Sequence, residues 1–171
     1  MLIKPRQDTL KFRGDYVSNY KILIEHKENV FDAESKRTKN DIIDLGIKGI
    51  KSVKVFQIYE IKGDILLQEI EKISNDLLLD PITQNIIINP DSKDSGVSVE
   101  VYYKSGVTDA VADTVKFGIK DMNINKELDV RTGKKYLLKG KLLSQNIKKI
   151  AEKILSNTVV QEYKIETGKA L

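Results

Sequence analysis

The sequence predicts an α+β protein built from two tandem β-α-β-β-α-β repeats. An offset of 77 residues aligns residues 20–88 with residues 97–165 without a gap, and about 20 of the 69 aligned pairs are identical. Strand-like and helix-like apolar patterns recur at equivalent positions in the two copies. Because a repeat of this length is a small domain rather than a solenoid unit, we expect the copies to form a fused pseudo-dimer.

The repeat divides the chain into five segments. They are an N-terminal arm (1–19), repeat 1 (20–88), a linker (89–96), repeat 2 (97–166) and a tail (167–171). The arm is basic, and we expect it to be poorly ordered unless it docks. The linker reads NPDSKDSG, and its Pro, Ser and Gly residues are typical of a boundary.

The first elements of each copy are a strand, a turn and a helix. Apolar runs predict strands at Tyr20–His26 and Val97–Tyr103. Asp32 and Asp109 are predicted to mark the start of a helix. An aspartate carboxylate at that position can accept a hydrogen bond from a free backbone N–H of the first turn. In the second copy the apolar face of this helix is predicted to consist of Val111, Val115, Ile119 and Met122.

Strand-forming stretches follow at Ser52–Lys62 and Asp129–Lys139, closed by Gly63 and Gly140. The pair Thr132-Gly133 interrupts the second stretch, which suggests either two short strands joined by a turn or one bent strand.

The second helix has the clearest pattern, an apolar spacing of four, three, four in both copies. Its apolar residues are Leu66, Ile70, Ile73 and Leu77, repeated as Leu143, Ile147, Ile150 and Ile154. A last strand is predicted near Gln84–Ile88 and Gln161–Ile165. This order of elements favours helices packed on one face of a sheet.

Composition excludes several kinds of chemistry. The chain of 171 residues has no cysteine, so disulfides, thiolate metal sites and a cysteine nucleophile are excluded. With no apolar run of about 18 residues and no leader pattern, we expect neither a membrane span nor a secretion signal, and a cytoplasmic location.

Charge is uneven between the copies. Residues 20–88 carry ten Lys/Arg and twelve Asp/Glu, a net of −2, whereas residues 97–165 carry thirteen and eight, a net of +5. This difference in net charge suggests that the two copies bind different partners or each other. The alternative is that solvent-exposed charges have diverged between the copies without a functional reason. The lysines of repeat 2 are either a solvated face or a docking patch for an acidic neighbour: Lys134, Lys135, Lys139, Lys141, Lys148, Lys149 and Lys153.

No catalytic, cofactor-binding or metal-binding residue is predicted in this segment. The ten glycines form neither G-x-G-x-x-G nor G-K-[ST], and no acidic cluster has the spacing of a magnesium site. His26 is the one histidine, and at a strand end it is interpreted as a packing or surface residue.

Two pairs of equivalent segments stand out in the repeats: KENVFDA (27–33) with KSGVTDA (104–110), and LLLDPITQNIII (77–88) with ILSNTVVQEYKI (154–165). They resemble the PurS family, the small subunit of phosphoribosylformylglycinamidine synthase in purine biosynthesis. Ala33, Ala110 and Thr158 stand where the family pattern has proline, which softens the turns without changing the fold. Two tandem copies are similar to the N-terminal PurS-like domain of the single-chain synthase, which mimics the dimer of the separate subunit.

The resemblance implies a PurS-dimer-like pseudo-twofold unit and a non-catalytic part of a ligase. The full synthase amidates formylglycinamide ribonucleotide with glutamine, using ATP and Mg, which this segment would not bind. Its implied partners are the synthetase core and the glutaminase, which it would bridge while shaping the ammonia path, with no nucleic acid or membrane partner. The chain is then either a fragment of a larger synthase or a free fused subunit.

Six residues are candidates for the interface with these partners. The exposed turns Lys27–Asp32 and Lys104–Asp109 are held by rigid elements, which favours a contact role. Tyr59 and Tyr136 either lie half-buried in the sheet or at the contact between copies.

Two other functions stay open at this stage. A small basic nucleic-acid-binding module is the main alternative, although aromatic residues are only 6% and the RRM aromatic signature is absent. A ligand-binding regulatory domain between the copies is the third.

Overall fold

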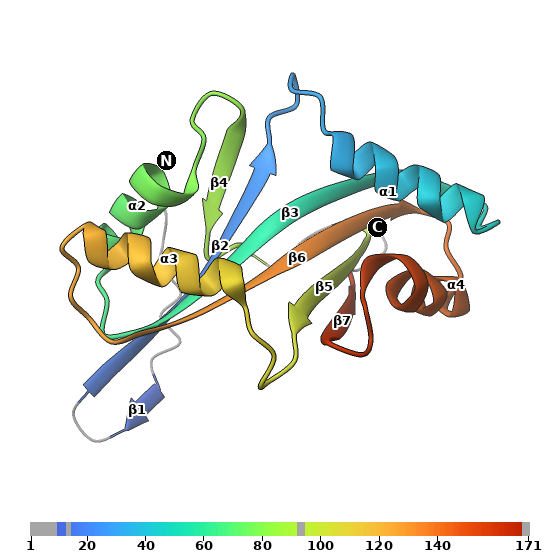
Figure 1. Cartoon of the computed structure of the whole chain (residues 1–171). Helices are drawn as coiled ribbons and strands as arrows, with labels where there is room; N and C mark the ends of the chain where they lie inside the picture. The colour runs from blue at the N-terminus through green and yellow to red at the C-terminus, as the bar shows by residue number, and fades with distance from the viewer. Residues whose placement is uncertain (1–9, 13–14, 92–94, 169–171) are drawn as a thin grey trace. The chain divides into compact units, whose positions relative to one another are not determined.

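The structure is a computed structural model that describes residues 10–12, 15–91 and 95–168. Repeat 1 has the order β2-α1-β3-α2-β4 and repeat 2 the order β5-α3-β6-α4-β7, so the predicted α+β repeat is confirmed (Figure 1). The elements are β1 (Leu10–Phe12), β2 (Asp15–His26), α1 (Ala33–Asp44), β3 (Ile50–Gly63), α2 (Leu67–Ile73), η1 (Ser74–Leu78), β4 (Gln84–Ile88), β5 (Val97–Tyr103), α3 (Ala110–Asp121), β6 (Leu128–Gly140), α4 (Ser144–Ile150), η2 (Ala151–Leu155) and β7 (Gln161–Thr167).

The chain forms two compact units that do not follow the repeat boundaries. Unit 1 contains β1 and β2 together with Ile58–Pro90 and Asp109–Thr132. Unit 2 contains Glu28–Gln57 and the described parts of 91–108 and 133–171. Unit 1 has the outer strands β2 and β4 of repeat 1 but the helix α3 of repeat 2. Unit 2 has the outer strands β5 and β7 of repeat 2 but the helix α1 of repeat 1.

The long middle element of each repeat is one continuous strand. The unit boundary passes between Gln57 and Ile58 in β3 and between Thr132 and Gly133 in β6, so each strand gives one half to each unit. Of the two alternatives for this element, the single strand is correct. Gly133 is a place of close approach rather than a break, because an added Cβ would lie 2.5 Å from the carbonyl oxygen of Val101.

The strand order is β1-β2-β3-β6-β5-β7, and β4 pairs with β2. The outer pairs are antiparallel and keep the same register in both units, with Ile24 opposite Ile86 and Val101 opposite Tyr163. These pairs are related by the same 77-residue offset as the sequence repeat. The repeat is thus a repeat of pairing geometry as well as of sequence.

The core of unit 1 lies between its strands and the helices α2 and α3. Ile22 and Ile24 of β2 pack with Ile70 of α2 and with Val115 and Ile119 of α3. In Figure 1 the two helices lie side by side although about forty residues separate them in the chain. Burying such a side chain contributes roughly 1.5–3 kcal/mol. Packing of α3 therefore ties repeat 2 to the core formed by repeat 1.

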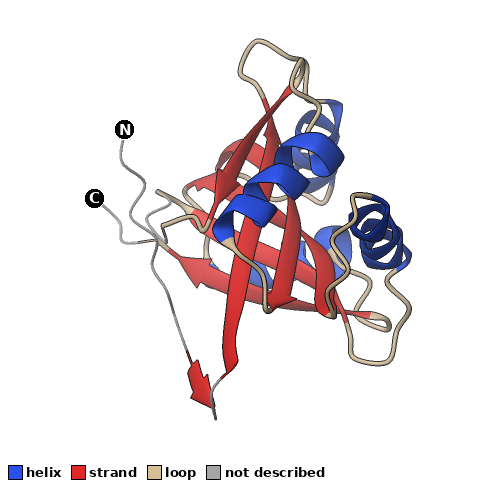
Figure 2. Ribbon diagram, turned by 90° about the vertical axis from the view of Figure 1, so that its left-hand side faces the viewer, coloured by secondary structure: helices blue, strands red, loops and turns tan. Residues whose placement is uncertain are grey.

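Unit 2 has the reciprocal core. Ile42 of α1 joins Val99 and Val101 of β5 and Ile147 and Ile150 of α4. The helices cover strands in this unit as in the other, as the blue and red elements of Figure 2 show. The predicted packing of helices on a sheet is confirmed, with the first helix of each repeat exchanged.

Helix α3 buries a slightly different face from the one predicted. Val115 and Ile119 are buried, but Val111 is 47% exposed and Ala112 is buried in its place. Met122 is half-buried and packs against the core of unit 1. Val111 is the second residue of the helix, and in this first turn it is Ala112 that faces the core of unit 1.

The second helix of each repeat departs from the predicted spacing in its last turn. The buried isoleucines are those predicted, Ile70 and Ile73 in repeat 1 and Ile147 and Ile150 in repeat 2. Each helix, however, ends in a π-helical turn. Its i→i+5 hydrogen bond runs from Leu79 N–H to Ser74 O in repeat 1 and from Ser156 N–H to Ala151 O in repeat 2, both at 3.0 Å. The wider turn moves the next inward position from four to five residues on. Leu155 is therefore buried rather than Ile154.

Part of the predicted N-terminal arm is strand. Residues 1–9 and 13–14 lie outside the described residues, but β1 pairs with β2 through Leu10 opposite Val17. Strand β2 begins at Asp15, five residues before the predicted start. Of the predicted tail, 169–171 lie outside the described residues. Within the described residues, none of the helices has the length and apolar character needed to cross a membrane.

Candidate docking site

Asp32 and Asp109 cap the helices α1 and α3, as predicted. The Asp32 carboxylate accepts from Ser35 N–H at 2.9 Å, and Asp109 accepts from Ala112 N–H at 2.9 Å. An N-cap carboxylate satisfies one of the free donors of the first turn and is worth about 1 kcal/mol.

Each capping aspartate also links its helix to the strand that follows, β3 in repeat 1 and β6 in repeat 2. The hydroxyl in this link belongs to the helix in repeat 1 and to the strand in repeat 2. In repeat 1 the Ser35 hydroxyl donates to Asp32 and accepts from Val55 N–H at 3.0 Å. In repeat 2 Asp109 itself accepts from Thr132 N–H and from the Thr132 hydroxyl, both at 2.8 Å. Val55 and Thr132 are equivalent positions. The carboxylates are therefore structural anchors.

Lys27 and Lys104 each hold a neighbouring turn of the chain through a hydrogen bond. Lys27 Nζ donates to Pro81 O at 2.6 Å, and Lys104 Nζ donates to Thr158 O at 2.6 Å. The acceptors are equivalent residues in the turn that precedes the last strand of each repeat. The predicted contact lysines thus fix a second pair of turns, which the sequence reading did not single out.

These turns are stiffened by their own side chains. In repeat 1 Asp80 accepts from Ile82 N–H at 2.9 Å and from the Thr83 hydroxyl at 2.7 Å, while Gln84 Oε1 accepts from Asp80 N–H at 2.9 Å. The bond from the Thr83 hydroxyl, followed by that from Ile82 N–H, lowers the pKa of Asp80. In repeat 2 the equivalent Asn157 and Gln161 form two of these three bonds, at 2.8–3.1 Å, since Val160 stands in the place of Thr83 and has no hydroxyl.

Each clamped turn presents one aliphatic side chain to solvent. Ile82 is 80% exposed and Val159, its equivalent, is 79% exposed. Ile82 lies in unit 1 and Val159 in unit 2. A β-branched side chain held in the open by a rigid turn loses little conformational entropy on binding, which suits a contact anchor. We name these two residues and their turns the aliphatic tips. Their sequence signal is the repeated aliphatic residue two positions after Asp80 or Asn157.

Tyr59 and Tyr136 belong to the interior. Tyr136 is 7% exposed within the core of unit 2, and Tyr59 is half-buried against the core of unit 1. Burial, with a smaller contribution from Glu34, raises the pKa of Tyr136 to about 12, and burial also raises the pKa of Tyr59. Both side chains lie in the sheet, and each packs in a core that contains residues of both repeats, so the two interpretations of these tyrosines do not exclude each other.

The raised pKa of Tyr136 predicts a loss of stability at high pH. Its stabilising contribution is complete below the unfolded pKa of 10 and is lost as pH rises through the folded pKa of about 12. We expect Tyr136→Phe to fall less in stability between about pH 10 and 12 than the parent chain, measured by urea unfolding at each pH. Equal pH profiles for the two proteins would contradict this.

The six predicted residues are divided between the two units. Unit 1 holds Lys27, Tyr59 and Asp109, and unit 2 holds Asp32, Lys104 and Tyr136. Each predicted turn is therefore shared between the units. Their contact role stays a prediction, whereas their internal bonds are structural.

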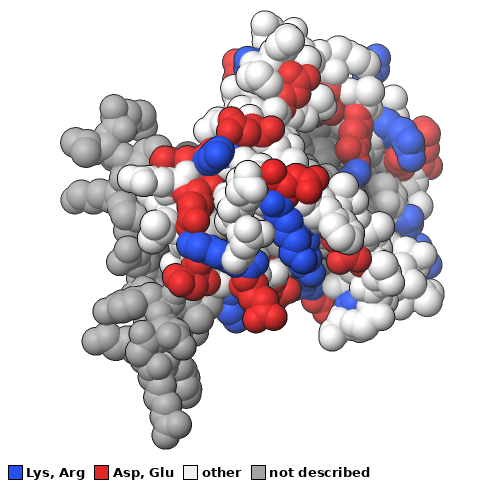
Figure 3. Space-filling model, turned by 60° about the vertical axis from the view of Figure 1, so that its left-hand side comes forward, with Lys and Arg blue, Asp and Glu red and all other residues white. Residues whose placement is uncertain are grey.

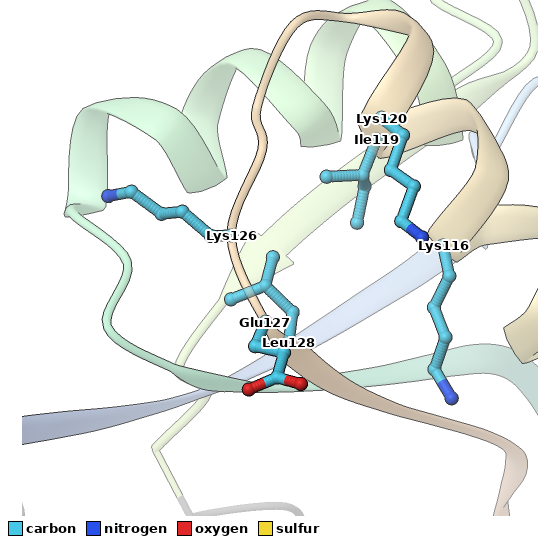
Figure 4. A pocket seen from close by; sticks show the side chains of 6 residues that line it. All are labelled: Lys116, Ile119, Lys120, Lys126, Glu127 and Leu128. Atoms are coloured by element: carbon cyan, nitrogen blue, oxygen red, sulfur yellow. The ribbon is translucent and has the colours of Figure 1, made fainter.

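A small pocket of about 120 Å³ lies where α3 leads toward β6 (Figure 4). Ile119 and Leu128 line it, and the charged ends do not converge on it. Lys126 extends away and pairs with Glu69 at 2.6 Å. A hydrogen bond from Leu66 N–H, and after it Lys126, lowers the pKa of Glu69. The pocket has the features of a surface hollow beside an ion pair.

The lysines of repeat 2 do not form one uniform solvated face. Lys135 is 7% exposed, Lys134 pairs with Glu34, and Lys148 lies 3.9 Å from Glu152. On the face shown in Figure 3, basic and acidic side chains intermix. Within the described residues, no group of three or more His, Asp or Glu could hold a metal ion.

The fold defines a class of protein, a tandem-repeat α+β protein in which each of two units carries an equivalent turn with an exposed aliphatic side chain. The sequence profile of PurS, described as phosphoribosylformylglycinamidine (FGAM) synthase, matches residues 19–91 and again residues 96–169. The chain therefore belongs to the PurS family, and its role is related to FGAM synthase in purine biosynthesis. A search of curated proteins gives no match.

Proposed function

We propose that this chain is a non-catalytic scaffold of an FGAM synthase, joining the synthetase part to the glutaminase part and helping to shape the ammonia path between them. ATP, Mg²⁺ and the ribonucleotide are bound by those other parts. The observation that carries the proposal is the pair of aliphatic tips, in which Ile82 and Val159 are presented by the same clamped turn in two units.

Two equivalent contact points suit a protein that touches two neighbours. A rigid turn positions its anchor before binding, so little free energy is lost to ordering. The unequal charge of the repeats, a net of −2 against +5, would allow each tip to meet a different surface.

The test reconstitutes the chain with the synthetase and glutaminase parts of its own synthase and measures FGAM formation. We expect Ile82→Asp combined with Val159→Asp to lower glutamine-dependent turnover at least about tenfold, because a contact anchor is worth more than 1.4 kcal/mol. Turnover with added ammonium salt should change little, since it bypasses the ammonia path.

Val111→Glu is the matched control. Val111 is also an exposed aliphatic residue, and its equivalent in repeat 1 is Glu34, so the helix position accepts a carboxylate. This variant should keep full glutamine-dependent turnover. Full turnover by the double tip variant would contradict the contact role, and turnover by the pure chain would contradict the non-catalytic role.

A further inference from the structure

Strand β4 is an outer strand of unit 1 without charged side chains. Within the part of the chain that the structure describes, it pairs with β2 alone. Its sequence is QNIII, with no Lys, Arg, Asp, Glu, Pro or Gly, in a chain that is 32% charged. Proteins usually protect outer strands with charge, proline or a bulge, because an unpaired edge accepts another strand.

The backbone ladder shows which groups of β4 face outward. Asn89 N–H donates to Lys21 O at 2.7 Å and Lys27 N–H donates to Thr83 O at 3.0 Å, so hydrogen-bonded pairs fall on every second residue between them. By this alternation Asn85 and Ile87 direct their backbone groups to β2.

Gln84, Ile86 and Ile88 consequently direct their backbone groups away from β2. The Gln84 N–H is already bonded to Asp80 O at 2.9 Å. The outer edge of β4 thus offers the N–H and C=O groups of Ile86 and Ile88 to an incoming strand.

The equivalent strand β7 is also an outer strand but carries charges. Glu162 and Lys164 occupy the positions of Asn85 and Ile87, and Glu166 follows, 2.6 Å from Lys164. One unit therefore has the usual protection of an edge and the other lacks it.

Strand β4 is complementary to itself. Three outward positions centred on Ile86 allow an antiparallel pairing in which Ile86 faces Ile86 and Gln84 faces Ile88, and Asn85 then lies opposite Ile87. No like charges meet. At the equivalent register β7 would bring the charged side chains of Glu162 and Lys164 opposite each other, whereas β4 pairs only uncharged side chains.

We propose that β4 pairs antiparallel with β4 of a second copy of this chain, so that the protein forms a twofold dimer through this edge. The pairing covers the backbone groups of Ile86 and Ile88 and part of Ile87, which is 38% exposed. A twofold interface is isologous, so one self-complementary strand is sufficient to define it.

The test measures the self-association of the full chain by analytical ultracentrifugation over a range of concentrations. The parent chain should pass from monomer to dimer. Asn85→Lys with Ile87→Lys places lysine opposite lysine in both Asn85–Ile87 pairs and should weaken the dimer at least about tenfold, by like-charge placement and loss of apolar contact. Since Asn85 and Ile87 are exposed and β7 carries a lysine at the Ile87 position, the far-UV circular dichroism should be unchanged.

Val111→Lys with Phe117→Lys is the control, because it makes a similar change at exposed positions of α3 and should leave the dimer intact. In amide exchange, the protection of Ile86 and Ile88 should rise with protein concentration. A chain that is monomeric throughout would overturn the proposal, even with both amides protected, since a segment of the same chain would then cover the edge. Equally tight dimers of parent and β4 variant would overturn it as well.

Discussion

Residues 95–171 expressed alone are expected not to give a folded monomer. The core of unit 2 includes Ile42, Ile47, Val53 and Val55, which all belong to repeat 1. Removing four buried side chains at roughly 1.5–3 kcal/mol each takes away about as much free energy as a domain of this size has in total. In the same fragment α3 would lose the β2 residues against which it packs.

Circular dichroism and sedimentation of this fragment check the expectation. We expect either an unfolded chain or a dimer in which two fragments exchange their first helices. The control is co-expression of residues 1–94 with 95–171, which keeps every described core residue and should restore the native spectrum. A cooperatively folded, monomeric fragment would show that the exchange of helices is not essential.

Asp109→Ala is expected to destabilise the chain by about 2–4 kcal/mol. It removes the cap of α3, worth about 1 kcal/mol. It also leaves the N–H of Thr132, a residue only 2% exposed, without its acceptor, at roughly 1–3 kcal/mol. The shift of the urea midpoint at constant slope measures the loss.

Asp32→Ala is the matched comparison, because it removes the equivalent cap. The Ser35 hydroxyl can still accept from Val55 N–H in that variant, so we expect a loss of about 1 kcal/mol only. Asp121→Ala, at the exposed end of α3, should change stability by less than about 0.5 kcal/mol. A loss for Asp32→Ala as large as that for Asp109→Ala would refute the different anchoring of the two helices.

The candidate site could be predicted only in part. Asp32 and Asp109 are recognisable as caps because capping depends on the residues of one turn. The partner of Asp109 is Thr132, which lies 23 residues away, and no local pattern reveals that bond. Lys27 and Lys104 were predicted at exposed turns, but their acceptors are 54 residues away in the chain, so the bracing of the aliphatic tips was not visible.

The fold was predictable where local periodicity decides it. The strands Val97–Tyr103 and Gln84–Ile88 have the predicted bounds, since alternation and turn residues fix them. The last turn of α2 was not, because a π-helical turn changes which residue faces inward without leaving a mark on the apolar spacing.

The amino-acid sequence by itself determined the two repeats, their elements and their family, because each of these depends on residues close together in the chain or on a fixed offset between copies. Only the tertiary structure decided that β3 and β6 run through both units and that α1 and α3 pack on the other repeat. The physical reason is that an apolar helix face specifies burial but not a partner. Because the two copies are similar, the apolar face of α1 or α3 could pack on the strands of either copy. Strands β3 and β6 are long enough to contribute to both units, and each of these helices packs on the outer strands of the other copy.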